Sequence, residues 1–138
     1  MFKLIGIKPE TLGGGNNMAT HPKKIAIVDD NKLCRDLITT ALANLTWTDV
    51  SSYDDGKKAW SALCNGGNAD IVITDVDMPE MDGFELLNKI KKKDPQKPCI
   101  LMSGTGRYKK IAQALCADGF LAKPFALTDL FNVVEQFA

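Results

Sequence analysis

The sequence has a single histidine, His21, which lies ahead of the first predicted strand of the folded part. A folded part without histidine argues against a histidine-based acid–base enzyme and against a histidine kinase. No run of 18 apolar residues occurs, so we expect no membrane-spanning helix. The start also lacks the basic flank and long apolar stretch of a signal peptide.

Closely spaced cysteine pairs are missing too. The four cysteines, Cys34, Cys64, Cys99 and Cys116, form no C-x-x-C pair of the kind that binds metals. Each lies in an apolar segment, where a free thiol behaves as a small hydrophobic group. We therefore expect buried free thiols, and a reducing cytoplasm as the location.

Neither sign of charge dominates the chain. Its 17 Lys and Arg residues balance 17 Asp and Glu residues, so the formal net charge is zero. An even balance leaves no overall electrostatic footprint for nucleic acid or an anionic membrane, and we expect neither as a partner. The length of 138 residues, with 45% apolar and 25% charged residues, is typical of one globular domain with a sizeable core.

The first 22 residues differ from the rest in composition. The stretch "ETLGGGNNMATHP" contains three consecutive glycines and two asparagines, which favours a flexible linker. We interpret residues 1–22 as a flexible leader that an expression vector could have supplied, with Met18 then as the natural start. Residues 23–138 form the predicted domain.

Short apolar strands and amphipathic helices alternate through this domain. Helical spacing of apolar residues and continuous apolar runs define the two kinds of segment. Asp82, with Glu85 three residues on, is a predicted helix N-cap, and Pro95 requires that helix to end near residue 94. The predicted strands are 23–28, 47–53, 70–74, 99–103 and 119–123, and the predicted helices are 31–45, 54–64, 82–94, 107–117 and 127–137.

This alternation predicts the fold class. Strands that are apolar throughout are typical of a parallel sheet with both faces covered. Right-handed crossovers then produce a doubly wound α/β fold, with five parallel strands, five helices and the flavodoxin-like strand order 2-1-3-4-5. On the last helix, we expect the inner face to carry Leu127, Leu130, Phe131 and Val134.

Polar side chains stand where four of the strands end. Asp29 and Asp30 follow the first strand, Asp75 the third, Ser103 ends the fourth and Lys123 ends the fifth. Sites in such sheets form at the carboxyl ends of strands that lie about 4.8 Å apart. We therefore expect these side chains in one crevice.

Three neighbouring carboxylates repel one another unless a cation or a proton intervenes. Mg²⁺ favours carboxylate and carbonyl oxygens, so we predict Asp30 and Asp75 as direct ligands, Asp29 as a direct or water-mediated one, and the backbone carbonyl of Asp77 as a further one. A nucleophilic Asp75 beside a metal and Lys123 suits phosphoryl transfer through an acyl phosphate.

The same residues resemble a known family. The segments "IVDD" at 27–30, "DVDMPEMDG" at 75–83 and "KPF" at 123–125, with Ser103 after an apolar strand, are similar to the receiver domain of two-component response regulators. The resemblance covers residues 23–138. It implies that Asp75 accepts a phosphoryl group from a phosphohistidine on a histidine kinase or phosphotransfer protein, and that the domain catalyses this transfer and its own dephosphorylation.

The resemblance also assigns roles around the phosphate. It implies Mg²⁺ as the cofactor, contacts from Ser103 and Lys123 to the phosphate, and a cis Lys123–Pro124 bond. Phe120 occupies the switch position where many relatives have tyrosine, and it has no hydroxyl to donate. The implied output surface for a downstream partner comprises the fourth helix, fifth strand and last helix, whether the domain acts alone or within a larger regulator.

Other interpretations remain open at this point. The D-x-D pattern of Asp75 and Asp77 is similar to haloacid-dehalogenase-type phosphatases, although Pro79 stands where they have Thr or Val. A flavodoxin-like nucleotide or flavin module would need a glycine-rich loop after the first strand. The domain could also bind partners without phosphorylation. Finally, Asp29 and Asp30 could cap the first helix, and Lys123 could be a solvated lysine.

Overall fold

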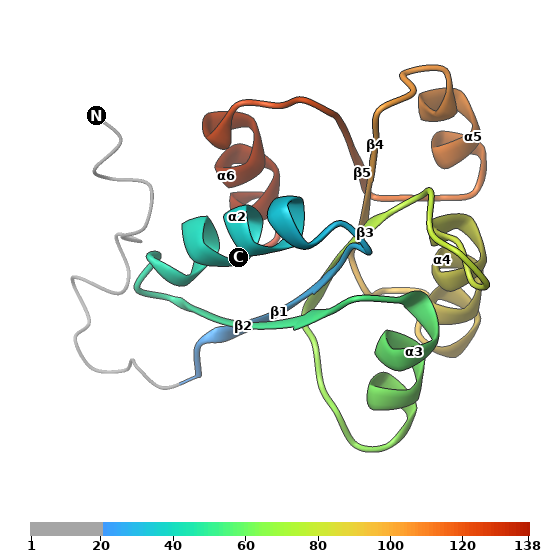
Figure 1. Ribbon diagram of the computed structural model, residues 1–138. Coiled ribbons are helices and arrows are strands. Elements are labelled where there is room, and N and C mark those ends of the chain that lie inside the picture. The colour runs from blue at the N-terminus through green and yellow to red at the C-terminus, as the bar shows by residue number, and fades with distance from the viewer. Residues whose placement is uncertain (1–20) are drawn as a thin grey trace.

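A single five-stranded parallel sheet organises residues 21–138, the part of the chain described by the computed structural model (Figure 1). The strand order is β2-β1-β3-β4-β5, as expected from the sequence. Apart from residues 21 and 22, the predicted leader lies outside the described residues. The strands are β1 (Lys23–Val28), β2 (Thr48–Tyr53), β3 (Ile71–Asp75), β4 (Cys99–Ser103) and β5 (Gly119–Ala122).

Helices cover both faces of the sheet. In Figure 1, α2 and α6 lie on one side, and α3, α4 and α5 lie on the other. The doubly wound α/β prediction is therefore confirmed. The helices of the described part are α2 (Lys32–Ala43), α3 (Gly56–Cys64), α4 (Gly83–Lys93), α5 (Tyr108–Ala114) and α6 (Leu127–Glu135).

The strands are buried on both faces because their side chains alternate between two cores. On β1, Ile25 and Ile27 pack toward α2 and α6, whereas Ala26 and Val28 pack toward α3, α4 and α5. All five residues of β3 and all five of β4 are buried. This double burial explains why the sequence shows continuous apolar runs rather than alternation.

Side-chain caps begin three of the helices. Asp82 Oδ1 accepts a hydrogen bond from the Glu85 N–H at 2.8 Å, so the predicted N-cap of α4 is confirmed. Asn31 caps α2 by accepting from the Cys34 N–H, and Asp55 caps α3 in the same way. Each cap satisfies one N–H group that has no partner within its helix.

Two burial predictions are wrong at helix ends. Leu127 is 40% exposed because it is the first residue of α6, although the other three residues predicted on that face are buried. Cys64 ends α3 and Cys116 follows α5, and both thiols are exposed, whereas Cys34 is half-buried and Cys99 buried. All four are free thiols, as predicted.

Within residues 21–138, no helix has the length and apolar character needed to cross a bilayer.

Gly83 brings the start of α4 against the end of β3. A Cβ atom at this position would overlap the Asp75 carbonyl oxygen and would lie 2.8 Å from the Val76 Cα. The Gly83 N–H also donates to the Val76 carbonyl at 2.9 Å. The absence of a side chain therefore sets the distance between α4 and the backbone of Asp75.

We expect Gly83→Ala to lower the free energy of unfolding by about 1–3 kcal/mol, because the methyl group must displace backbone atoms. Equilibrium urea denaturation measures this loss. Gly106→Ala is the matched control, since no atom lies within 4 Å of the position that its methyl group would occupy and its φ is not positive. Equal losses in the two variants, or none in Gly83→Ala, would contradict the close-approach argument.

Candidate functional site

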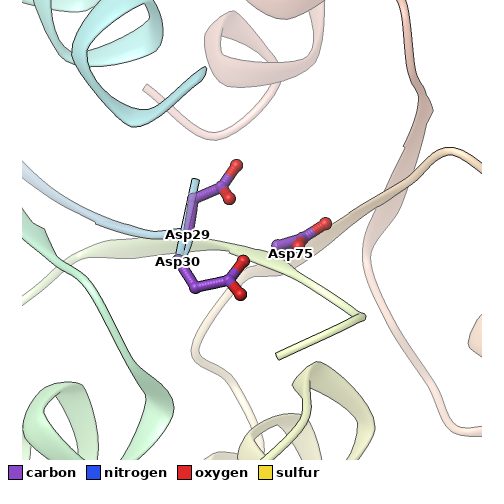
Figure 2. A group of neighbouring side chains, drawn as sticks. All are labelled: Asp29, Asp30 and Asp75. Atoms are coloured by element: carbon purple, nitrogen blue, oxygen red, sulfur yellow. The ribbon is translucent and has the colours of Figure 1, made fainter. Parts of the chain in front are cut away.

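The acidic side chains converge because of the register of the central strands. Val28 pairs with Thr74, so Asp29 and Asp75 stand one residue further along neighbouring strands. Figure 2 shows the carboxylates of Asp29, Asp30 and Asp75 gathered where β1 and β3 end. One oxygen from each lies within 4.8 Å of the other two. Asp29 and Asp75 are buried and Asp30 is exposed.

Lys123 reaches this cluster from the far side of β4. Its Nζ donates to Asp29 Oδ2 at 2.9 Å and to Asp75 Oδ1 at 3.1 Å. The Lys123 N–H donates to the Ser103 carbonyl at 2.8 Å, which fixes the backbone from which the side chain extends. The Lys123–Pro124 bond is cis, as the resemblance implied. Lys123 is therefore a member of the site and not a solvated surface lysine.

The electrostatics of the site favour a cation. Burial raises the pKa of Asp75 to about 6; Lys123 opposes this rise and the Asp29 charge adds to it. Burial alone would lower the pKa of Lys123, but its hydrogen bond to Asp29 and the charges of both acids raise it instead. One ammonium thus faces three carboxylates, and the remaining negative charge is what a bound cation would neutralise.

Asp29 is held from several directions. Its Oδ1 accepts from the Asn31 N–H at 2.9 Å, its Oδ2 accepts from Lys123, and its own N–H donates to the Tyr53 carbonyl at 3.1 Å. The Arg35 guanidinium donates to the Asp29 carbonyl oxygen at 2.8 Å. Helix capping, by contrast, falls to Asn31, so the first helix does not depend on either acid as an N-cap.

The three carboxylates fit a hard divalent cation. With metal–oxygen bonds of about 2.1 Å, octahedral ligands lie about 3.0 Å apart when adjacent and about 4.2 Å apart when opposite. One oxygen from each of the three acids lies within 4.8 Å of the other two, so small side-chain rotations would bring them to these distances. Within the described residues, no hydrogen bond or ion pair engages the Asp30 carboxylate, so its oxygens are free to act as ligands.

The side chains of the other three expected site residues, Ser103, Asp77 and Phe120, make no hydrogen bond or ion pair with the carboxylate cluster in the described part of the chain. Ser103 is fully buried at the end of β4, and its Oγ accepts from the Thr105 N–H at 3.0 Å. Within the described residues, no hydrogen bond joins that hydroxyl to Asp75. Asp77 is exposed in the loop after β3, and its side chain is not part of the carboxylate cluster. Phe120 is half-buried on β5 against the core under α3, α4 and α5.

Three residues beside the cluster were not identified from the sequence. Asn31 carries a readable signal, because an asparagine before a helical pattern is a favoured N-cap. Burial, followed by a hydrogen bond to Asp29, raises the pKa of the Cys34 thiol, which places it next to the acid. Arg35 has no such signal, since its contact depends on how α2 crosses the end of β1.

Comparison with known proteins gives one consistent result. A family model described as the response regulator receiver domain matches residues 25–135. A chemotaxis protein CheY homolog of Campylobacter jejuni is 34% identical over 117 residues, which cover 82% of this chain and 90% of that protein. The two-component response regulator ORR7 of rice is 34% identical over 116 residues, covering 81% of this chain and 55% of that protein.

Solved structures show the same similarity. The response regulator TrrA of Thermotoga maritima, in complex with Mg²⁺–BeF, aligns with a TM-score of 0.77 at 28% identity and covers 84% of this chain and 99% of its own. CheY4 of Vibrio cholerae aligns with a TM-score of 0.75 at 25% identity, covering 85% and 99%.

We expect Asp75→Asn to change how stability depends on pH in metal-free protein. Because the pKa of Asp75 is raised from 3.8 to about 6, protonation favours the folded state. That contribution is complete below about pH 4 and is lost as the pH rises through 6. Wild type should therefore lose up to about 3 kcal/mol relative to Asp75→Asn between pH 4 and pH 7.

Urea denaturation in a metal chelator at several pH values measures this difference. Asp77→Asn, which changes an exposed carboxylate two residues away, serves as the control and should follow wild type. Parallel stability curves for wild type and Asp75→Asn would show that the Asp75 carboxyl is not destabilised in the folded protein.

Proposed function

The chain belongs to the response regulator receiver family, and from that premise we propose that Asp75 is the residue on which it carries the phosphoryl group. Receiver domains are phosphorylated by histidine kinases and signal to downstream partners, so the chain is a phosphorelay switch. One observation carries the assignment to Asp75: this buried carboxylate ends a central strand, 3.1 Å from Lys123 and beside two further acids.

The chemistry that we propose needs an ionised Asp75. A carboxylate oxygen attacks phosphorus, the bond from phosphorus to the donor histidine nitrogen breaks, and the freed imidazole takes up a proton. Later attack by water on the acyl phosphate releases inorganic phosphate and restores the carboxylate. Lys123 favours both steps, because its charge lowers the pKa of Asp75 against the effect of burial and attracts the phosphoryl oxygens.

Receiver domains bind Mg²⁺ at an acidic pocket, and this chain has such a cluster. We infer that Asp30 and Asp75 are direct ligands, that Asp29 contributes directly or through water, and that the Asp77 carbonyl completes the protein share. The hydrogen bonds that already occupy both oxygens of Asp29 favour its water-mediated role. When bound, the ion offsets negative charge on the transferring oxygens. The Mg²⁺–BeF complex of the Thermotoga relative supports this assignment.

The output that we propose uses α5, β5 and α6 as the surface for a partner protein, in the cytoplasm. Ser103 links the site to this surface, because its carbonyl accepts from Lys123 and its hydroxyl accepts from Thr105 ahead of α5. Phe120 on β5 has no hydroxyl, so any response there is one of packing. A phosphatase of the D-x-D type also forms an acyl phosphate, so the distinguishing feature of the proposed switch is one stoichiometric phosphorylation of Asp75 rather than turnover of external esters.

We expect incubation with acetyl phosphate and Mg²⁺ to add one phosphoryl group to the wild-type protein. Intact-mass spectrometry detects the addition directly. Asp75→Ala should remain unmodified because it lacks the nucleophile, and omission of Mg²⁺ should abolish the addition in wild type.

Asp77→Ala is the matched control, since it removes a carboxylate two residues from Asp75 and leaves the backbone carbonyl in place. It should be phosphorylated like wild type. Phosphorylation of Asp75→Ala to the wild-type extent would place the acceptor elsewhere. Steady release of phosphate with no modified protein at any time would instead indicate a turnover phosphatase.

A further inference from the structure

We propose that Arg35 is a positioning residue for the metal site: it holds the peptide between Asp29 and Asp30 and thereby directs the Asp30 carboxylate toward Asp75. This inference rests on the proposed function, because it assumes that the acidic cluster binds Mg²⁺. It concerns a residue that touches neither the ion nor the phosphate.

The contact is made where the sheet stops supporting the chain. The pairing of β1 with its neighbours ends at Val28, whose partners are Tyr53 and Thr74. The next carbonyl, that of Asp29, accepts from the Arg35 Nη1 at 2.8 Å in a partly buried setting. A side chain from the first turns of α2 therefore replaces a strand neighbour as the donor to this peptide.

Asp30 depends on this peptide more than Asp29 does. The Asp29 carboxylate is already fixed by the Asn31 N–H and by Lys123. Asp30 is exposed, and no hydrogen bond within the described residues orients its carboxylate. The plane of the 29–30 peptide sets the direction of the bond from Cα to Cβ at Asp30, so a donor that fixes this plane also limits where the Asp30 oxygens lie.

The charge of Arg35 also has a small effect on the loop that follows β2. The pKa of Asp54, in the loop after β2, is lowered mainly by its hydrogen bond to Lys58 and to a smaller extent by the Arg35 charge. The guanidinium charge therefore acts weakly on the loop that follows β2, whereas its hydrogen bond is to the end of β1.

Because Arg35 is positively charged, the direction in which its removal changes the Mg²⁺ dissociation constant tests the proposal. A positive charge beside three carboxylates repels Mg²⁺, so removing that charge alone would tighten binding. Removing a positioning donor would weaken binding, as loss of groups that orient metal ligands does. The two roles therefore predict opposite changes in the Mg²⁺ dissociation constant.

The decisive measurement is Mg²⁺ binding to the unphosphorylated protein by calorimetry. We expect Arg35→Met to raise the dissociation constant about 10-fold despite the loss of a repelling charge. Arg35→Lys keeps the charge and an ammonium donor in place of the planar guanidinium, so partial positioning should give a dissociation constant between those of wild type and Arg35→Met. An unchanged or smaller dissociation constant in Arg35→Met would overturn the proposal.

Lys32→Met is the matched control, because Lys32 is a cation on the same helix whose partner is the exposed Asp36. It should bind Mg²⁺ as wild type does or slightly more tightly. Thermal unfolding in a chelator shows whether each variant is folded, and Arg35→Lys keeps the test available if Arg35→Met is not. Weakened binding in Lys32→Met equal to that in Arg35→Met would also overturn the positioning role.

The Mg²⁺ dependence of acetyl phosphate labelling gives a second readout. For Arg35→Met, the Mg²⁺ concentration at half-maximal rate should rise about 10-fold, while the rate at saturating Mg²⁺ should approach that of wild type. A lowered plateau with an unchanged midpoint would contradict the proposal. If wild type itself bound no Mg²⁺, both the proposed metal site and this inference would be wrong. If wild type bound Mg²⁺ and Arg35→Met had the same dissociation constant, only this inference would be wrong.

Discussion

The bridge from Lys123 to Asp29 and Asp75 is the interaction on which the rest of the site depends. It joins residues that are 94 and 48 positions apart in the sequence, and it brings the end of β5 to the ends of β1 and β3. Two buried carboxylates without this ammonium would each lose solvation with no compensating charge. The bridge forms only when β1, β3, β4 and β5 are in register, so the site exists only in the folded sheet.

The site costs stability that the two cores offset. Asp29 and Asp75 are 0% and 6% exposed, and the raised pKa of Asp75 shows that its ionised form is disfavoured by this burial. The same burial suits the nucleophilic role that we propose for Asp75, because little water would compete with the phosphoryl group or with Lys123. Apolar layers on both faces of β1 and β3 fix the backbone beneath the acids, and so the repulsion between them cannot be relieved by moving the strands apart.

The sequence predicted most of the site because strand ends in a parallel sheet are forced together. The apolar runs define the strands, and the acids and Lys123 stand at their ends. The parallel strand order then brings those ends to one edge of the sheet. Burial at helix ends was less predictable: Leu127 and Cys116 have the right spacing, but no neighbouring element covers them. Individual hydrogen-bond partners could not be predicted either. No sequence pattern indicates that the Ser103 hydroxyl accepts a hydrogen bond from the Thr105 N–H.

Close contacts join the end of β3 to α4 and α5, and Phe120 has no hydroxyl that could add a hydrogen bond to them. Gly83 lets the first turn of α4 rest on the Asp75 carbonyl, where any side chain would overlap it. The next residue, Phe84, packs edge-on against Tyr108 at the start of α5, with ring centroids 5.4 Å apart. The Asp75 backbone is therefore in direct contact with the start of α4. The Phe84–Tyr108 pair in turn joins α4 to α5. Because Phe120 has no hydroxyl, these steric contacts join Asp75 to α4 and α5 without a hydrogen bond from that side chain.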